Sequence, residues 1–327
     1  MLRGKNQDVH VMLRLYNAEG GELKAAESSN FKDALWIDVI APSTEEVERL
    51  HEEFDIDLQD VADCLDPNER ARVEIDESYD LLVLRSVLAE QKNGKRVVSR
   101  IETMPIGIFV VKNKIITVRI GTSFNYDELT VDLKRKPKTE SKEDLFLLLV
   151  RKVNRDIERR VRPMERIIAN IQEKILEDEA DEIADDAFTL SNGLIVLNTT
   201  LLSNLNAMSM LSRAKKLHLT KEKLDIAEDL ENDIAQLYEM TTIYREIMSN
   251  VLDAYESALA NSLQVVMKTL TTISLILILP LMITALFSMN LALPFDELDP
   301  FAFWMVAGLS AVAVVGLWAF FRLKKIL

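Results

Sequence analysis

The residues whose types and spacing could do chemistry lie near the C-terminal end of the chain. A long uncharged run ends there in a Ser-Met-Asn tripeptide, residues 288–290, and a loop follows that carries Asp296, Glu297 and Asp299 but no Lys or Arg. Three carboxylates without a counter-charge raise the local concentration of cations, an effect that salt screens. A plain hydrophilic turn would show the same acids, so the loop alone leaves both interpretations open.

The composition favours cations over nucleic acids as binding partners. The 327 residues include 39 Lys and Arg against 53 Asp and Glu, which gives a net charge of −14, whereas phosphate binding needs clustered basic residues. The single cysteine excludes an intrachain disulfide, and the three distant histidines lack the spacing of a zinc site. The sequence has no Gly-rich phosphate loop or nucleophile motif, so we expect neither an enzyme nor an organic cofactor.

Two uncharged stretches near the C-terminus are predicted to cross a membrane. They cover residues 269–289 and 301–321, and about 21 residues at 1.5 Å each span the ~30 Å hydrocarbon core. Lys268 precedes the first span and a basic tail, residues 322–327, follows the second, while the loop between them, residues 290–300, is acidic. The positive-inside rule then places both termini in the cytoplasm. No signal peptide is recognisable, so we expect a multi-pass protein of the cell (inner) membrane.

The two spans differ in polarity. Two helices cannot enclose a water-filled path, so ion transport would require several copies around an axis. Hydroxyl side chains occur almost wholly in the first span, at Thr269, Thr271, Thr272, Ser274, Thr284 and Ser288. We therefore expect the first span to lie inside the assembly and the second to face lipid. Hydroxyl groups that bond the carbonyls of their own helix would explain the same residues without a pore.

Residues 1–138 are predicted to form a cytoplasmic α/β domain. Alternating or continuous apolar runs of strand length occur in VHVMLRLY, ALWIDVI, YDLLVLRSVLAE, KRVVSRIE, PIGIFVVK and KIITVRI, with a hairpin turn expected at residues 93–94. Ser43 and Glu46 have the spacing of a capping box, which predicts the start of a helix. The pattern indicates one mixed sheet with helices beside it.

Residues 139–218 are predicted to form paired long helices. One helix is expected over residues 143–176, where the basic run of residues 151–166 would be a solvated or salt-bridged face. The acidic segment 177–186 follows, and we expect a helix tip or turn there because like charges repel within a continuous helix. A second helix is expected over residues 187–217.

A third helix is predicted to form a stalk. It covers residues 219–268, begins near Thr220, and meets no Pro or Gly before Pro280. If it continues into the first apolar span, it has roughly 70 residues and a length of about 105 Å. Such a stalk would join the cytoplasmic domain mechanically to the membrane, although its apolar pattern also fits a static coiled-coil seam.

Two longer segments resemble those of a known family. YESALANSLQVVMKTLTTISLILILPLMITALFSMNLALPF looks like the signature region of the CorA family of divalent-cation channels, which has a proline in the first span and a GMN tripeptide at its end. LQDVADCLDPNERARVEIDESYDLLVL resembles an N-terminal segment of that family, so the resemblance extends from about residue 35 to the C-terminus. It implies a funnel-shaped homopentamer with an α/β cytoplasmic domain, a long α-helical stalk and two C-terminal transmembrane helices, of which the first lines the pore.

The resemblance also implies the residues of the pore. In the family, the Asn of the tripeptide forms a selectivity ring at the outer mouth, a role that transfers to Asn290. Five carboxamide oxygens could hold a hydrated Mg²⁺ ion through its waters. An apolar constriction near Met267 and Leu270 would gate by dewetting. The pore-lining positions implied by the family pattern are Gln264, Met267, Leu270 or Thr271, Ser274, Ile278, Ser288 and Met289.

The resemblance further implies a cytoplasmic cation sensor. Family members sense intracellular Mg²⁺ through carboxylates between neighbouring subunits, and the matching positions are Asp60 and Asp229, with Asp253 in an acidic ring of the stalk. Bound Mg²⁺ would hold the subunits together and favour the closed state, so the ion would be both substrate and regulatory ligand. Acids on a solvated helix are common, so an ordinary surface position is the alternative for Asp229.

The tripeptide departs from the family pattern. Ser288 replaces a glycine and adds a Cβ atom and a hydroxyl group, and Pro280 lies ten residues before Asn290, where many members have eleven. The leading hypothesis is a channel for Mg²⁺, with Co²⁺ or Ni²⁺ as further substrates, driven inward by the membrane potential. The alternatives are a Zn²⁺ transporter of the ZntB type and a structural or regulatory membrane protein that has lost selective conduction.

Overall fold

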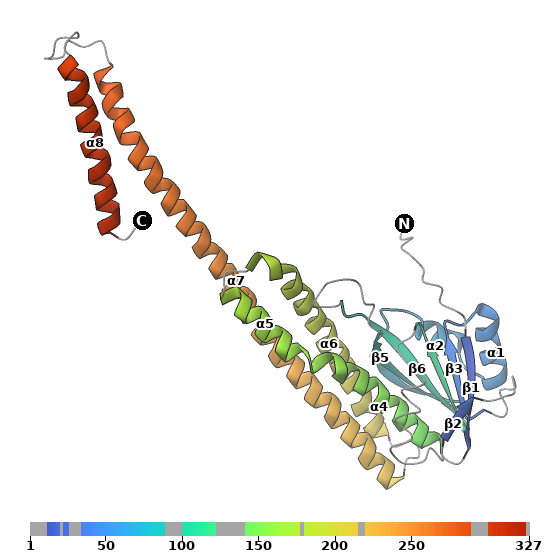
Figure 1. Ribbon diagram of the computed structural model, residues 1–327. Helices are drawn as coiled ribbons and strands as arrows, with labels where there is room; N and C mark the ends of the chain where they lie inside the picture. The colour runs from blue at the N-terminus through green and yellow to red at the C-terminus, as the bar shows by residue number, and fades with distance from the viewer. Residues whose placement is uncertain are drawn as a thin grey trace. The chain divides into compact units, whose positions relative to one another are not determined.

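The computed structural model describes residues 12–19, 22–25, 34–88, 100–121, 141–176, 180–214, 220–288 and 300–324. The chain forms two compact units, Met1–Leu252 and Asp253–Leu327. Helix α7 (Lys221–Phe287) passes through both of them (Figure 1). The third helix, whose continuation the sequence left open, thus runs without a break into the first apolar span.

The first unit is built on one mixed sheet, as predicted. Its strands are β1 (Met12–Glu19), β2 (Glu22–Ala25), β3 (Trp36–Ile40), β4 (Arg72–Ile75), β5 (Asp80–Val87), β6 (Thr103–Val111) and β7 (Lys114–Arg119). They lie in the order β2-β1-β3-β7-β6-β5-β4. β3 and β7 pair in parallel, and the other neighbouring strands pair antiparallel.

Most of the predicted strand segments contain an observed strand, and the differences lie at the sheet edges and in one connection. The edge strands β2 and β4 have only four residues each, too few to give a pattern that predicts them. In the predicted strand of residues 95–102, residues 100–102 lie outside any strand. The rest of that segment and the expected turn at residues 93–94 lie outside the described residues.

Two short helices pack on the sheet. In α1 (Thr44–Phe54) the predicted capping box is confirmed, because Ser43 Oγ accepts from Glu46 N at 3.3 Å and Glu46 Oε2 accepts from Ser43 N at 2.8 Å. α2 (Leu58–Asp63) follows after a short connection. Both helices contribute to a core that includes Ile37, Leu50, Ile56, Val61, Val83, Phe109 and Ile116.

The single helix expected over residues 143–176 is wrong, because the structure has two helices there. α4 (Lys142–Val161) and α5 (Met164–Leu176) are separated by a turn that contains Pro163. Proline has no N–H to continue the hydrogen-bond ladder of α4, while its fixed φ suits the start of the next helix.

Helix α6 (Ala180–Ala214) is held on the sheet by polar side chains as well as apolar ones. The buried Asn204 side chain accepts from Arg85 N of β5 at 2.8 Å and donates to Arg85 O at 2.9 Å. Ser203 Oγ accepts from Ala71 N, just before β4, at 2.9 Å. The acidic segment 177–186 was expected to be a helix tip or turn. α5 ends at Leu176, directly before this segment, and α6 begins within it, at Ala180.

Three helices of the described chain are long and apolar enough to cross a membrane by length and composition. They are Ala184–Ser212 within α6, α7, and Phe303–Leu323 within α8 (Pro300–Leu323). Half of the most apolar window of α6 is buried inside the protein, against 6% for α7 and 0% for α8. The packing of α6 on the sheet accounts for its buried half, whereas the described chain leaves almost all of the most apolar windows of α7 and α8 uncovered.

Candidate functional site

Most of the candidate pore residues share one face of α7. At about 100° per residue, spacings of eleven, three and four residues return to nearly the same direction. The candidates related by these spacings are Asp253, Gln264, Met267, Thr271, Ser274 and Ile278. Leu270 and Ser288 lie at the border of this face, about 80° from its centre, whereas Thr271 lies about 20° from it, so the helix favours Thr271 over Leu270 as its member.

The side chains on and around this face are exposed in the single chain. Met267 is 60% exposed and Ile278 is 50% exposed, and Val265 and Leu277, on other sides of the helix, reach 54% and 68%. A helix that is apolar on all sides is stable only inside a protein or a membrane. The second half of α7 therefore requires lipid or further copies of the chain around it.

The hydroxyl groups of the first apolar span donate to carbonyls of their own helix, which was the alternative named from the sequence. The pairs are Thr269 to Val265 (3.0 Å), Thr271 to Met267 (2.7 Å), Thr272 to Lys268 (2.8 Å), Ser274 to Leu270 (2.8 Å), Thr284 to Pro280 (3.1 Å) and Ser288 to Ala285 (2.9 Å). A hydroxyl oxygen that has donated its hydrogen still accepts hydrogen bonds. Such oxygens can bind the waters of a hydrated cation, whose hydrogens point outward from the metal.

Ser288 closes α7 without the backbone conformation that glycine favours. Its N–H donates to the carbonyl of Thr284 at 3.0 Å, and the described residues with positive φ do not include it. Of the other predicted residues at the outer end, Met289 and Asn290 lie outside the described residues. The loop acids Asp296, Glu297 and Asp299 also lie outside them, so the roles of all these residues stay predictions.

Asp60 is held by two side chains that the sequence analysis did not identify. It is 8% exposed, and its Oδ2 accepts from Tyr79 Oη at 2.6 Å while its Oδ1 accepts from Arg72 Nη2 at 3.0 Å. Burial and the hydrogen bond to Asp60 raise the pKa of Tyr79 above its ordinary value. Both carboxylate oxygens of Asp60 thus have partners inside the chain.

Arg72 is the centre of a cluster of carboxylates. Besides Asp60, it contacts Asp63 at 3.1 Å and Glu74 at 3.3 Å, and it also pairs with Glu69. Burial opposes the charge of Arg72, but these carboxylates outweigh it and raise the pKa of Arg72 above its ordinary value. The signal in the sequence was the density of acids around two arginines, Arg70 and Arg72, between residues 57 and 76. A cation that reaches Asp60 must compete with this guanidinium.

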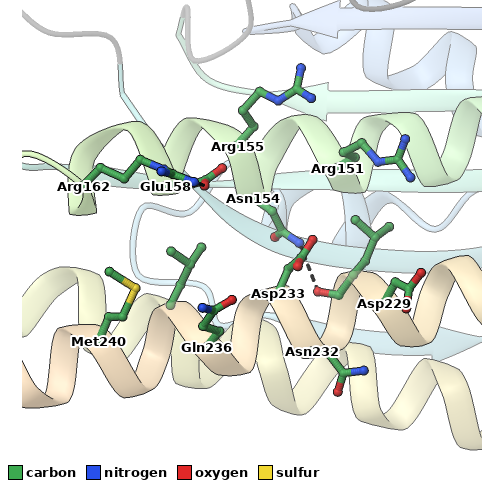
Figure 2. Close-up of a pocket in the computed structure, with 12 residues that line it drawn as sticks. Arg151, Asn154, Arg155, Glu158, Arg162, Asp229, Asn232, Asp233, Gln236 and Met240 are labelled. Carbon is green, nitrogen blue, oxygen red and sulfur yellow. Dashed lines mark hydrogen bonds and ion pairs between the residues drawn. The ribbon is translucent and has the colours of Figure 1, made fainter. Parts of the chain in front are cut away.

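Asp229 lies in a groove between α4 and α7. The groove has a volume of about 640 Å³ and is also lined by Arg151, Asn154 and Asp233. Figure 2 shows that its arginines come from α4 and its aspartates from α7. Within the described residues no hydrogen bond or ion pair joins Asp60 to Asp229, and no three His, Cys, Asp or Glu side chains are placed to hold a metal. A sensor formed between subunits stays a prediction, as does the role of the exposed Asp253.

Comparison with known proteins identifies the family. Residues 31–325 match the family described as CorA-like Mg²⁺ transporter protein. The chain belongs to the CorA family. A curated relative, the cobalt/magnesium transport protein CorA of Methanocaldococcus jannaschii, is 27% identical over 286 residues, which cover 86% of this chain and 87% of the relative. The resemblance stated from the motifs is thereby confirmed.

Solved structures of similar proteins confirm the CorA-like fold. The complete structure of the CorA magnesium transporter of M. jannaschii superposes with a TM-score of 0.77 at 23% identity, covering 96% of this chain and 98% of that one. The ZntB cytoplasmic domain of Vibrio parahaemolyticus gives a TM-score of 0.59 at 14% identity, covering 77% of this chain and 99% of that domain. The ZntB likeness shows the fold alone and does not favour zinc as a substrate.

Proposed function

We propose that this protein is a divalent-cation channel or transporter with Mg²⁺ as its main substrate and Co²⁺ and Ni²⁺ as further ones. The observation that carries the proposal is the CorA family match over residues 31–325, which includes both apolar helices. The name of the M. jannaschii relative, a cobalt/magnesium transport protein, supports Mg²⁺ and Co²⁺ among these substrates. The protein would thus act as a transporter and not as an enzyme.

The ion path runs along α7 in a homopentamer, as in the family resemblance. The exposed face from Asp253 to Ile278 lines the path, and α8 lies against lipid. Because Mg²⁺ gives up its waters reluctantly, the ion passes hydrated, and the back-bonded hydroxyls of Thr271 and Ser274 accept hydrogen bonds from its waters. Asn290 holds the hydrated ion at the outer mouth, where the loop acids concentrate cations.

The membrane potential supplies the driving force. Lys268 before the first span and the basic residues after the second favour cytoplasmic termini and a protein of the inner membrane. A divalent ion that moves inward gains about 4.6 kcal/mol per 100 mV, twice the value for a single charge. Passive influx at resting potential therefore requires no ATP hydrolysis.

Intracellular Mg²⁺ closes the channel in this proposal. The ion binds carboxylates between subunits, at Asp60 and Asp229, and reaches the acidic ring at Asp253. At Asp60 it competes with Arg72, whose guanidinium lies 3.0 Å from the carboxylate. When Mg²⁺ is scarce, Asp60 remains with Arg72 and the subunits separate. An apolar constriction at Met267, assisted by Leu270, then opens to water.

Uptake into liposomes tests the proposal. Purified protein is reconstituted with an internal indicator dye, a K⁺ gradient with valinomycin sets the potential, and Mg²⁺, Co²⁺, Ni²⁺ and Zn²⁺ are added separately. We expect Mg²⁺ uptake that increases with inside-negative potential. Uptake of Zn²⁺ alone would favour the ZntB-type alternative. No uptake of any of the four ions, by either the wild type or Ser288→Gly, would favour a structural or regulatory protein.

A further inference from the structure

The groove between α4 and α7 carries opposite charges on its two walls. Arg151 comes from α4, whereas Asp229 and Asp233 come from α7 (Figure 2). Within the part of the chain that the structure describes, none of these three side chains forms an ion pair or hydrogen bond. This differs from Arg162 at the end of the groove, whose Nε donates to Glu158 at 2.7 Å. The charges of Arg151 and of the two aspartates are therefore available to a ligand.

The acidic wall offers only part of a metal site. Asp229 and Asp233 are four residues apart and share one face of α7. Magnesium is commonly bound in proteins by one or two carboxylates together with waters and the phosphates of a substrate, and not by a complete cage of protein ligands. Two carboxylates on one helix thus fit a Mg²⁺ ion that arrives already bound to phosphate.

The α4 wall supplies what a phosphate needs. The guanidinium of Arg151 can donate two parallel hydrogen bonds to phosphate oxygens. A bare anion would be repelled by Asp229 and Asp233, and a bare cation would be repelled by Arg151. A complex of a divalent cation with a polyphosphate presents both charges at once, and so it is the ligand class that satisfies both walls.

Neutral residues of the groove support a ligand of this size. Asn154 is 5% exposed, and its carboxamide Oδ1 has no hydrogen-bond partner within the described chain. Figure 2 shows its side chain projecting from α4 toward Asp233. A ligand hydroxyl or a water of the metal would supply the missing donor. Leu237 and Met240 add apolar surface, and about 640 Å³ is within the range of small-molecule pockets.

We infer that the groove between α4 and α7 binds a divalent-metal complex of a polyphosphate, of which a Mg²⁺-bound nucleoside triphosphate is one source and inorganic polyphosphate another. Arg151 binds the phosphate oxygens, and Asp229 and Asp233 bind the metal through its waters. The site lies outside the proposed ion path, so the inference does not depend on conduction. It shares Asp229 with the proposed Mg²⁺ sensor, so phosphate-bound magnesium and the free ion would compete for this carboxylate.

Calorimetric titration of the full-length protein in detergent tests the inference. The probes are ATP with MgCl₂, tripolyphosphate with MgCl₂, tripolyphosphate with EDTA, and MgCl₂ alone. We expect both magnesium complexes to bind, and the metal-free polyphosphate to bind at least about 10-fold more weakly. Equal binding of the two complexes indicates that only the polyphosphate is recognised, and tighter binding of ATP indicates a nucleotide site. Both results support the inference.

Two variants and one control assign the binding to the groove. Arg151→Gln removes a charged hydrogen-bond donor and should weaken binding of the magnesium complex about 10- to 100-fold. Asp233→Asn should reduce the difference between the complex and the metal-free polyphosphate. Arg159→Gln changes an exposed arginine of the same helix that does not line the groove, and its affinity should equal that of the wild type. Unfolding temperatures without ligand confirm that each variant is folded.

The inference is overturned if neither magnesium complex binds at millimolar concentration, or if Arg151→Gln and Asp233→Asn both bind as the wild type does. It is also overturned if Arg151→Gln dissociates the oligomer in the absence of ligand, because the charges would then serve contacts between copies. Uptake measured without any polyphosphate separates the two proposals. Intact uptake without groove binding removes only this inference, and groove binding without uptake removes only the proposed channel.

Discussion

Arg72 offers the sharpest test of the cytoplasmic carboxylate cluster. The substitution Arg72→Gln removes the cation that contacts Asp60, Asp63, Glu69 and Glu74. The four carboxylates then remain close together without a counter-charge, and removing one partner of a poorly hydrated ion pair leaves the other uncompensated. We expect the variant to be less stable than the wild type when no divalent cation is present.

The exposure of each carboxylate sets the size of the effect. The Asp60 side chain is 11% exposed, and a charged hydrogen bond of this kind contributes about 1.5–3 kcal/mol. The side chains of Asp63, Glu69 and Glu74 are 28%, 24% and 50% exposed, so each of these pairs adds only about 0.2–1 kcal/mol. Contributions within one cluster are not additive, and we expect a total of about 2–4 kcal/mol. For a unit of this size that lowers the melting temperature by about 5–15 °C.

Thermal unfolding of the full-length protein in detergent, with and without MgCl₂, measures the effect. Arg49→Gln is the matched control, because it breaks an exposed pair with Glu53 at 3.7 Å, with side chains 53% and 40% exposed. The control should change stability by at most about 0.5 kcal/mol. If Asp60 receives Mg²⁺, Arg72→Gln should gain more stability from MgCl₂ than the wild type does, because the ion no longer competes with the guanidinium.

A melting temperature of Arg72→Gln equal to that of Arg49→Gln would refute the reasoning about the cluster. A loss of the expected size that MgCl₂ restores no better than in the wild type would have a different meaning. It would leave the structural role of Arg72 intact and remove Asp60 from the proposed sensor.

Conduction, sensing and acid stability each give a further test. Asn290→Ala should abolish uptake or its ion preference in liposomes while the oligomer persists on size-exclusion chromatography. Unchanged flux would contradict the role of Asn290 at the outer mouth. Asp60→Ala combined with Asp229→Ala should reduce the protection against proteolysis that Mg²⁺ gives, and equal protection would count against the sensor. Burial opposes the ionisation of Glu143, but hydrogen bonds from its own backbone amide and Ser141 and the charges of Lys223 and Lys142 lower its pKa. The stability that Glu143 contributes is therefore present above its ordinary pKa of 4.5 and lost as the pH falls below that value. The melting temperature of Glu143→Gln should fall less steeply over this range, and identical profiles would contradict the assignment.

The elements with strong local patterns could be predicted from the sequence. The capping box at Ser43 and Glu46 and the long apolar runs of β5, β6 and β7 reflect interactions between residues near in the chain. Pro163 also carried a local signal. Because proline has no backbone N–H, the end of α4 just before it could have been recognised from the sequence. The four-residue strands β2 and β4 had no such signal, since their pairing depends on neighbouring strands.

The partners of the candidate site residues could not be predicted, because they come from other elements. Asp60 in α2 accepts a hydrogen bond from Tyr79 only because the fold brings the residue just before β5 next to α2. The groove at Asp229 exists only because α4 and α7, about eighty residues apart in the sequence, lie side by side. A spacing pattern within one segment identifies the face of a helix but not what the fold places opposite that face.

The structure also changes the meaning of the serine at the end of α7. A glycine at this position could serve either a backbone conformation that other residues avoid or a close approach between chains. Ser288 keeps helical hydrogen bonding to Thr284 and has no positive φ, so the first reason does not apply here. Its hydroxyl donates to the carbonyl of Ala285 at 2.9 Å, and its position on the helix is about 80° from Ile278 and about 40° from Ser274, at the border of the proposed pore face. Any influence of Ser288 on ion preference must therefore act through its side chain, at the border of that face or in the packing of the outer end of α7, and not through a strained backbone.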